Sequence, residues 1–122
     1  MNIESIAPES TKRVFTLKEA NQLLPLVFHI TEDSQKLVRR LINSLQAVRG
    51  QNLLMASQLE DQINVEMTKW ESKMRRLGGL PKGMWLIDFD AGNGYFCWKF
   101  PENEIRFWHG YKDGFSGRTE IQ

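Results

Sequence analysis

The chain has 122 residues, of which 41% are hydrophobic and 25% are charged, a composition typical of a folded domain and unlike that of a disordered chain. This length fits one domain with one core and is too short for two independent cores. The 16 basic and 15 acidic side chains leave a net charge of +1, which excludes a global field that draws proteins to nucleic acid or anionic membranes.

The chain carries one cysteine, Cys97, which excludes an internal disulfide and a multi-cysteine zinc site. No apolar stretch reaches the length of a signal-peptide core or a membrane span. We therefore expect a cytoplasmic protein without membrane contact. Residues 1–14 are polar around Pro8, and we expect a flexible N-terminal arm before a single domain at residues 15–122.

A first helix is predicted at about residues 16–49. Thr16 and Glu19 have the spacing of a capping box, in which each side chain bonds the other's backbone N–H. One helical face collects the following residues: Leu24, Val27, Thr31, Ser34, Val38, Leu41, Leu45 and Val48. Pro25 either kinks this helix or marks the start of its main part, and we favour the kink.

A second helix is predicted at about residues 53–77. Its apolar positions recur at helical spacing: Ala56, Leu59, Ile63, Met67, Trp70, Met74 and Leu77. Gly78 follows Arg75 and Arg76, a combination typical of a helix end. The short link around Gly50 predicts an antiparallel hairpin, roughly 35–50 Å long. We expect this coiled-coil-like hairpin to leave apolar surface uncovered.

After Pro81 the hydrophobic period changes to two, which predicts a sheet at about residues 84–109 and a tail at 110–122. Strands are expected at 85–90, 95–100 and 104–109. The predicted fold class is α+β, a long antiparallel helical hairpin followed by a three-stranded antiparallel β-meander.

A four-residue turn at 91–94 would set Asp90 opposite Tyr95 and fix the strand register. One sheet face then collects mainly apolar residues, which we expect to pack on the helices: Trp85, Ile87, Phe89, Phe96, Trp98, Phe100, Ile105, Phe107 and His109. The other face collects Leu86, Asp88, Asp90, Tyr95, Cys97, Lys99, Arg106 and Trp108. In this register Asp88, Cys97 and Trp108 share one row.

The polar face, with an acid, bases and an aromatic plane, could hold a small anion or a planar ligand. The alternative is a solvated face whose charges pair across strands while the tail covers Trp108. The turn Gly114–Gly117 could present Arg118 to a carboxylate or phosphate, or Arg118 could pair with Asp113 or Glu120. The candidate binding residues are Asp88, Lys99, Glu102, Arg106, Trp108, His109 and Arg118.

The remaining motifs give weaker evidence of a functional site. His29, Glu32 and Asp33 share a helix face without a second histidine, and we expect no metal and no cofactor. Acidic residues interrupt the arginine pairs at 39–40 and 75–76, so nucleic-acid binding is not expected. Cys97 stands among aromatic residues in a strand, where a cysteine is normally inert.

Two stretches resemble an uncharacterised bacterial family, domain of unknown function 2203. The first is Phe15–Asn21 with Leu23-Leu24-Pro25. The second comprises Asp88-Phe89, Cys97-Trp98, Glu102, Ile105, Trp108-His109 and Gly114–Arg118. The resemblance spans residues 15 to about 121 and implies a small bacterial protein. It implies no activity, because none is established for the family.

Two hypotheses follow. The first is a non-enzymatic binding or regulatory module that forms a homodimer or higher oligomer through its helices and presents the polar sheet face to a small anionic ligand or a protein. The second is a small enzyme acting on an anionic substrate, with Asp88 or His109 as acid/base and Arg118 as anion clamp. The absence of a catalytic motif favours the first.

Overall fold

The computed structural model describes residues 13–122. Two helices, α2 (Leu17–Val48) and α3 (Leu53–Arg76), precede an antiparallel sheet. The predicted α+β class and both helix ranges are confirmed, each helix to within one residue. The expected arm at residues 1–14 lies outside the described residues except for its last two.

Helix α2 begins at the predicted capping box. The Thr16 hydroxyl accepts a hydrogen bond from the Glu19 backbone N–H at 3.1 Å, and the Thr16 N–H donates to Glu19 Oε1 at 2.9 Å. The helix runs through Pro25 without interruption, so its main part does not start there. An exposed proline costs the helix one hydrogen bond but leaves its buried face intact.

The seam between α2 and α3 is partly polar. The Trp70 indole N–H donates to the buried Thr31 hydroxyl at 2.8 Å, and the Ser34 hydroxyl donates to Glu66 at 2.6 Å. These bonds fix which turn of α2 faces which turn of α3. Helix α3 ends at Arg76, and Gly78 just beyond it has a φ of 96°, a conformation that glycine adopts without strain.

The sheet has five strands rather than the predicted three, in the order β1 (Leu80–Gly83), β2 (Leu86–Asp90), β3 (Tyr95–Lys99), β4 (Phe107–His109), β5 (Thr119–Glu120). Strand β1 contains Pro81, and β5 has only two residues. Neither carries a hydrophobic alternation long enough to predict a strand.

The register is as predicted between β2 and β3, where Asp88 pairs with Cys97 and Asp90 with Tyr95. It was wrong by one residue at β4, where Cys97 faces Phe107 rather than Trp108. Phe107 and His109 therefore lie on the face away from the helices, and Trp108 lies on the helix side. Ile105 lies in the core as predicted, but its N–H and carbonyl bond the Asn21 side chain at 2.7 and 3.1 Å instead of a strand, so the alternation of β4 starts at Phe107 rather than at Glu104.

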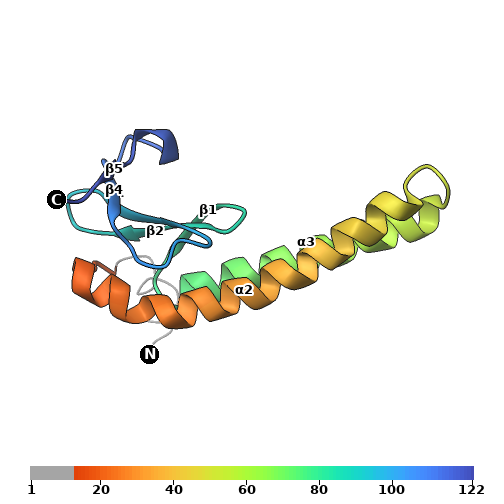
Figure 1. Cartoon of the computed structure of the whole chain (residues 1–122), viewed down its shortest axis with the longest axis horizontal. Helices are drawn as coiled ribbons and strands as arrows, with labels where there is room; N and C mark the ends of the chain where they lie inside the picture. Colours follow the sequence, from red (N-terminus) through yellow and green to blue (C-terminus); the bar gives the residue numbers. More distant parts are fainter. Residues whose placement is uncertain (1–12) are drawn as a thin grey trace, which may run out of the picture.

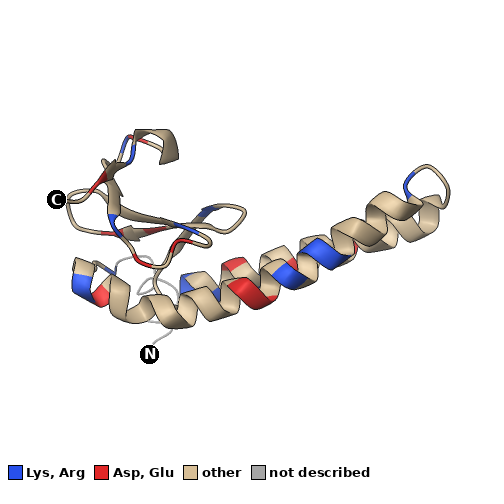
Figure 2. Cartoon of the chain, in the orientation of Figure 1, with Lys and Arg blue, Asp and Glu red and all other residues tan. Residues whose placement is uncertain are grey.

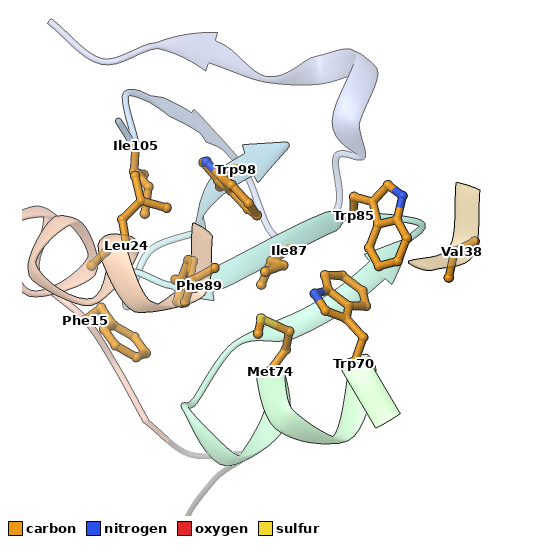
Figure 3. Close-up of a cluster of buried hydrophobic side chains, with 12 residues drawn as sticks. Phe15, Leu24, Val38, Trp70, Met74, Trp85, Ile87, Phe89, Trp98 and Ile105 are labelled. Atoms are coloured by element: carbon orange, nitrogen blue, oxygen red, sulfur yellow. The ribbon is translucent and has the colours of Figure 1, made fainter. Parts of the chain in front are cut away.

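The core lies between the helices and the inner sheet face (Figure 3). The Trp70 and Trp85 rings meet edge to face at 5.0 Å, as do Phe15 and Phe89 at 5.1 Å. Ile87, Phe89 and Trp98 are fully buried, as the predicted register requires. This core anchors only the part of the hairpin near the sheet, and the rest of α2 and α3 projects well beyond it (Figure 1).

Candidate functional site

The outer face of the sheet, opposite the helices, holds three buried polar side chains: Asp88 from β2, Cys97 from β3 and His109 from β4. We call them the outer-face cluster. Their exposed fractions are 3%, 0% and 3%, and one ligand-type atom from each lies within 4.8 Å of the other two. Because isolated buried charges are costly, such a cluster needs internal compensation.

His109 is hydrogen-bonded at both ring nitrogens. Nε2 lies 3.1 Å from Asp88 Oδ1, and Nδ1 lies 2.9 Å from the Gly110 carbonyl oxygen. A carbonyl only accepts, so Nδ1 carries a hydrogen and donates it. The Nε2–Oδ1 contact is then made through one proton shared by the imidazole and the carboxylate.

Cys97 stays a thiol over the ordinary pH range. Burial, with the neighbouring Asp88 carboxylate, raises the pKa of Cys97 to about 12, although the Arg118 guanidinium acts in the opposite direction. Since the thiolate is the nucleophilic form, the protonated Cys97 is a poor nucleophile. The expectation of an inert Cys97 agrees with this environment.

A second charged pair borders the cluster. Arg118 binds Glu102 through both terminal nitrogens, with N···O distances of 3.1 and 2.6 Å. The guanidinium also stacks on the rings of Phe107 and Phe115, 4.0 and 4.3 Å from their centroids. Arg118 therefore pairs with neither Asp113 nor Glu120, and its charge is neutralised within the fold.

The segment 110–118 covers the cluster. It is held by hydrogen bonds between Gly110 and Asp113 and by the short helix η2 (Phe115–Gly117). Between this segment and the sheet lies a pocket of about 350 Å³, which we call the dyad pocket because Asp88 and His109 border it. Its other lining residues are Lys82, Leu86, Tyr95, Tyr111, Asp113, Gly114 and Phe115.

The structure brings together four of the seven predicted site residues. Asp88 and His109 form a pair, as do Glu102 and Arg118, and the two pairs flank Cys97. Lys99 and Arg106 are exposed and do not line the dyad pocket. The expectation that His109 lies on the core face was wrong, and the expectation of a solvated polar face was wrong for Asp88 and Cys97.

Trp108 lies away from the cluster, contrary to its predicted place beside Asp88. Its indole N–H donates to Asn93 at 3.3 Å, and it lines a larger hollow of about 540 Å³ on the helix side. Glu19, the one charged side chain among the described residues that line this hollow, is already bound to the Thr16 cap. We therefore place the candidate site at the smaller dyad pocket, where ionisable groups converge.

The rim of the dyad pocket was not predicted from the sequence. Lys82, Tyr95, Tyr111 and Phe115 line it, and their distances along the chain gave no sign of the grouping. Tyr111 donates a 2.7 Å hydrogen bond to Asp90, which raises the pKa of Tyr111. Strand β5 in the tail pairs with β4, and this pairing folds residues 110–118 back over the sheet. The sequence did not predict this strand, so the grouping of these residues was not expected.

The other sequence candidates lie on the hairpin. His29 and Asp33 form an exposed pair with a 3.4 Å separation. Both helices carry acidic and basic residues, and neither sign occupies the whole length of a helix (Figure 2). Among the described residues, neither helix combines the length and apolar character needed to cross a membrane.

Fold and site together define a helical hairpin joined to a small sheet with a covered polar cluster. A family model described as "Uncharacterized conserved protein (DUF2203)" matches residues 13–121, and the chain belongs to this family. The resemblance noted from the sequence is thus confirmed, while a bacterial origin stays a prediction. Searches of the curated proteins and of the solved structures give no match.

Proposed function

We propose that the protein is a self-associating binding module whose dyad pocket receives a small planar carboxylate. The observation that carries this proposal is the convergence of aromatic rings and ionisable groups on one pocket of about 350 Å³. Tyr95 and Tyr111 stand edge to face at 5.0 Å, and Tyr95 lies 5.6 Å from the His109 ring. Such walls favour a flat ligand.

Lys82 supports the choice of an anion. Its ammonium nitrogen lies 5.4 Å above the Tyr95 ring, and no ion pair to it occurs within residues 13–122. An unpaired lysine at the rim of an aromatic pocket attracts a carboxylate. Arg118 is a weaker candidate for this role than the sequence indicated, because Glu102 already occupies both of its terminal nitrogens.

Binding is favoured over catalysis by the hydrogen bonds of His109. Both ring nitrogens already have partners, so neither is free to take a proton from a substrate. The enzymatic alternative, with Asp88 or His109 as acid/base, requires one of these bonds to break. It predicts that the protein turns over a substrate, that His109→Gln abolishes this activity, and that Lys82→Gln raises the KM.

The ligand proposal is tested with benzoate as probe, by chemical-shift mapping in the ¹H–¹⁵N spectrum. Shifts should concentrate at Lys82, Tyr95, His109 and Tyr111, and Lys82→Gln should weaken binding about tenfold, the loss of one charge-assisted contact. Lys99→Gln is the matched control, since Lys99 is exposed on the same face outside the pocket. Scattered shifts, or equal losses in both variants, would overturn the proposal.

Self-association is proposed through the part of the hairpin that projects past the sheet (Figure 1). In α3 only Trp70 and Met74 are buried, which leaves the apolar positions of the helix's first four turns partly open. A groove of about 320 Å³ runs between the helices there, lined by Leu37, Leu41, Asp61, Gln62, Val65, Glu66 and Lys69. Apolar surface of this kind marks interaction sites.

The charged residues beside this groove are arranged so that a second copy of the chain can pair with them. Val65 is 56% exposed, and Asp61 and Lys69 flank it four residues away on either side, on the same helical face. A two-fold axis at Val65 with antiparallel α3 helices sets Asp61 of one copy opposite Lys69 of the other. This surface is therefore self-complementary, as a two-fold interface requires.

A charge-swap series tests the dimer by sedimentation velocity at micromolar concentration. Asp61→Lys and Lys69→Glu should each shift the chain toward monomer, because each places like charges opposite one another. The double variant should restore the dimer. A monomeric wild-type protein, or a double variant no better than the single variants, would contradict this interface.

A further inference from the structure

The outer-face cluster offers three different donor atoms to one point: an imidazole nitrogen of His109, a carboxylate oxygen of Asp88 and the sulfur of Cys97. All lie within 4.8 Å of one another, and all three side chains are buried. Ligand atoms on a tetrahedral zinc ion, with bonds of about 2.0–2.3 Å, are themselves some 3.3–3.7 Å apart. The His109 and Asp88 atoms, 3.1 Å apart, are already close to that spacing, and the Cys97 sulfur, within 4.8 Å of both, reaches it by a small movement toward them.

Nδ1 of His109, the ring nitrogen that does not face Asp88, is hydrogen-bonded in the way seen in metal-bound histidines. Such histidines almost always donate their other N–H to a carboxylate or a backbone carbonyl, which fixes the ring and its tautomer. Here Nδ1 donates to the Gly110 carbonyl at 2.9 Å and leaves the Nε2 lone pair directed at Asp88. The proton shared by Nε2 and Oδ1 occupies the place that a cation would take.

We propose that Asp88, Cys97 and His109 form a zinc site with its fourth position open to the dyad pocket. Asp88 and His109 both line that pocket, so water or a ligand can reach the ion. Three protein ligands with one open position are typical of zinc sites that bind or activate a further molecule. One imidazole, one carboxylate and one thiolate form a donor set suited to Zn²⁺.

The charges of the cluster balance when the ion is bound. Zinc binding displaces the thiol proton of Cys97 and the proton shared by Asp88 and His109, and both protons leave to solvent. The thiolate and the carboxylate then neutralise the two positive charges of the ion. Arg118, although near Cys97, adds no net charge because Glu102 binds it on two nitrogens.

The site is independent of the proposed carboxylate ligand and is tested without it. The full chain is stripped with chelator and titrated with Co²⁺, a spectroscopic substitute for Zn²⁺. One equivalent should bind and give a thiolate-to-cobalt charge-transfer band together with intense visible bands of tetrahedral cobalt. Since Cys97 is the only cysteine, the charge-transfer band identifies the ligand even where a variant fails to fold.

Variants then locate the ion. Cys97→Ser should remove the charge-transfer band and weaken Zn²⁺ binding at least about 100-fold, more than the loss of an outer hydrogen bond to a ligand. Lys99→Gln should leave the cobalt spectrum unchanged, because Lys99 is exposed outside the dyad pocket. No bound cobalt, or a spectrum without sulfur character, would overturn the zinc site.

Discussion

His109 Nε2 lies 3.1 Å from Asp88 Oδ1, and the two side chains are only 3% and 4% exposed. The same pair of residue types recurs on the hairpin, where His29 and Asp33 are 3.4 Å apart with side chains 70% and 66% exposed. One fold thus contains a buried and a solvated copy of one interaction. This contrast makes the energetic role of the buried pair measurable.

Asp88→Ala should lower the free energy of unfolding by about 3–5 kcal/mol, because it leaves the buried His109 ring without its partner. Asp33→Ala removes the solvated pair and should change stability by less than about 1 kcal/mol. Urea denaturation of both variants gives the comparison. Equal effects would show that burial does not strengthen the Asp88–His109 pair.

Cys97 should make stability depend on alkaline pH. Burial raises its pKa from 9.0 to about 12, so the unfolded chain loses the thiol proton first. The stabilisation linked to the protonated thiol is complete below pH 9 and is lost as the pH rises toward 12. In chelator, the wild type should therefore lose stability relative to Cys97→Ser above pH 9. Parallel pH profiles of stability for the two proteins would contradict a raised pKa of the Cys97 thiol.

The Arg118–Glu102 pair should hold the C-terminal segment on the sheet. Arg118→Lys cannot form the two-nitrogen contact, and we expect a loss of about 1–3 kcal/mol with faster amide exchange in residues 114–121. The control is Arg106→Lys, whose 3.9 Å contact with Glu104 is exposed. Unchanged amide exchange in Arg118→Lys would contradict the role of this pair in holding the C-terminal segment.

Gly94 should tolerate no side chain. An added Cβ would lie 2.6 Å from the His109 carbonyl oxygen and closer still to the Trp108 ring. Gly94→Ala should cost about 2–3 kcal/mol by overpacking. Gly114→Ala is the control, since no atom of residues 13–122 lies within 4 Å of that added Cβ, and it should be nearly neutral. Thermal unfolding of the two variants distinguishes them.

The helices could be predicted because their signals are local. The capping box joins residues three apart, and the seam repeats every three or four residues, so neither depends on distant parts of the chain. The turn before Tyr95 was equally local, and it fixed the pairing of β2 with β3. These elements place Asp88 and Cys97 side by side, as expected.

The β4 register could not be predicted from local pattern. Asn21 on α2 binds Ile105 across 84 positions of sequence, so Ile105 lies before the strand, and the pairing of β4 begins at Phe107, one residue out of the predicted register. Because strand side chains alternate between faces, the shift exchanges Trp108 for His109 on the outer face. The sequence therefore indicated most members of the site while placing its histidine on the wrong side.

Asp88, Cys97 and His109 should bind one zinc ion together. X-ray absorption at the zinc edge, on protein loaded with one equivalent of Zn²⁺, tests it most directly. We expect one sulfur neighbour at about 2.3 Å and nitrogen or oxygen neighbours at about 2.0–2.2 Å. A shell of nitrogen and oxygen alone, or zinc lost on gel filtration, would contradict it.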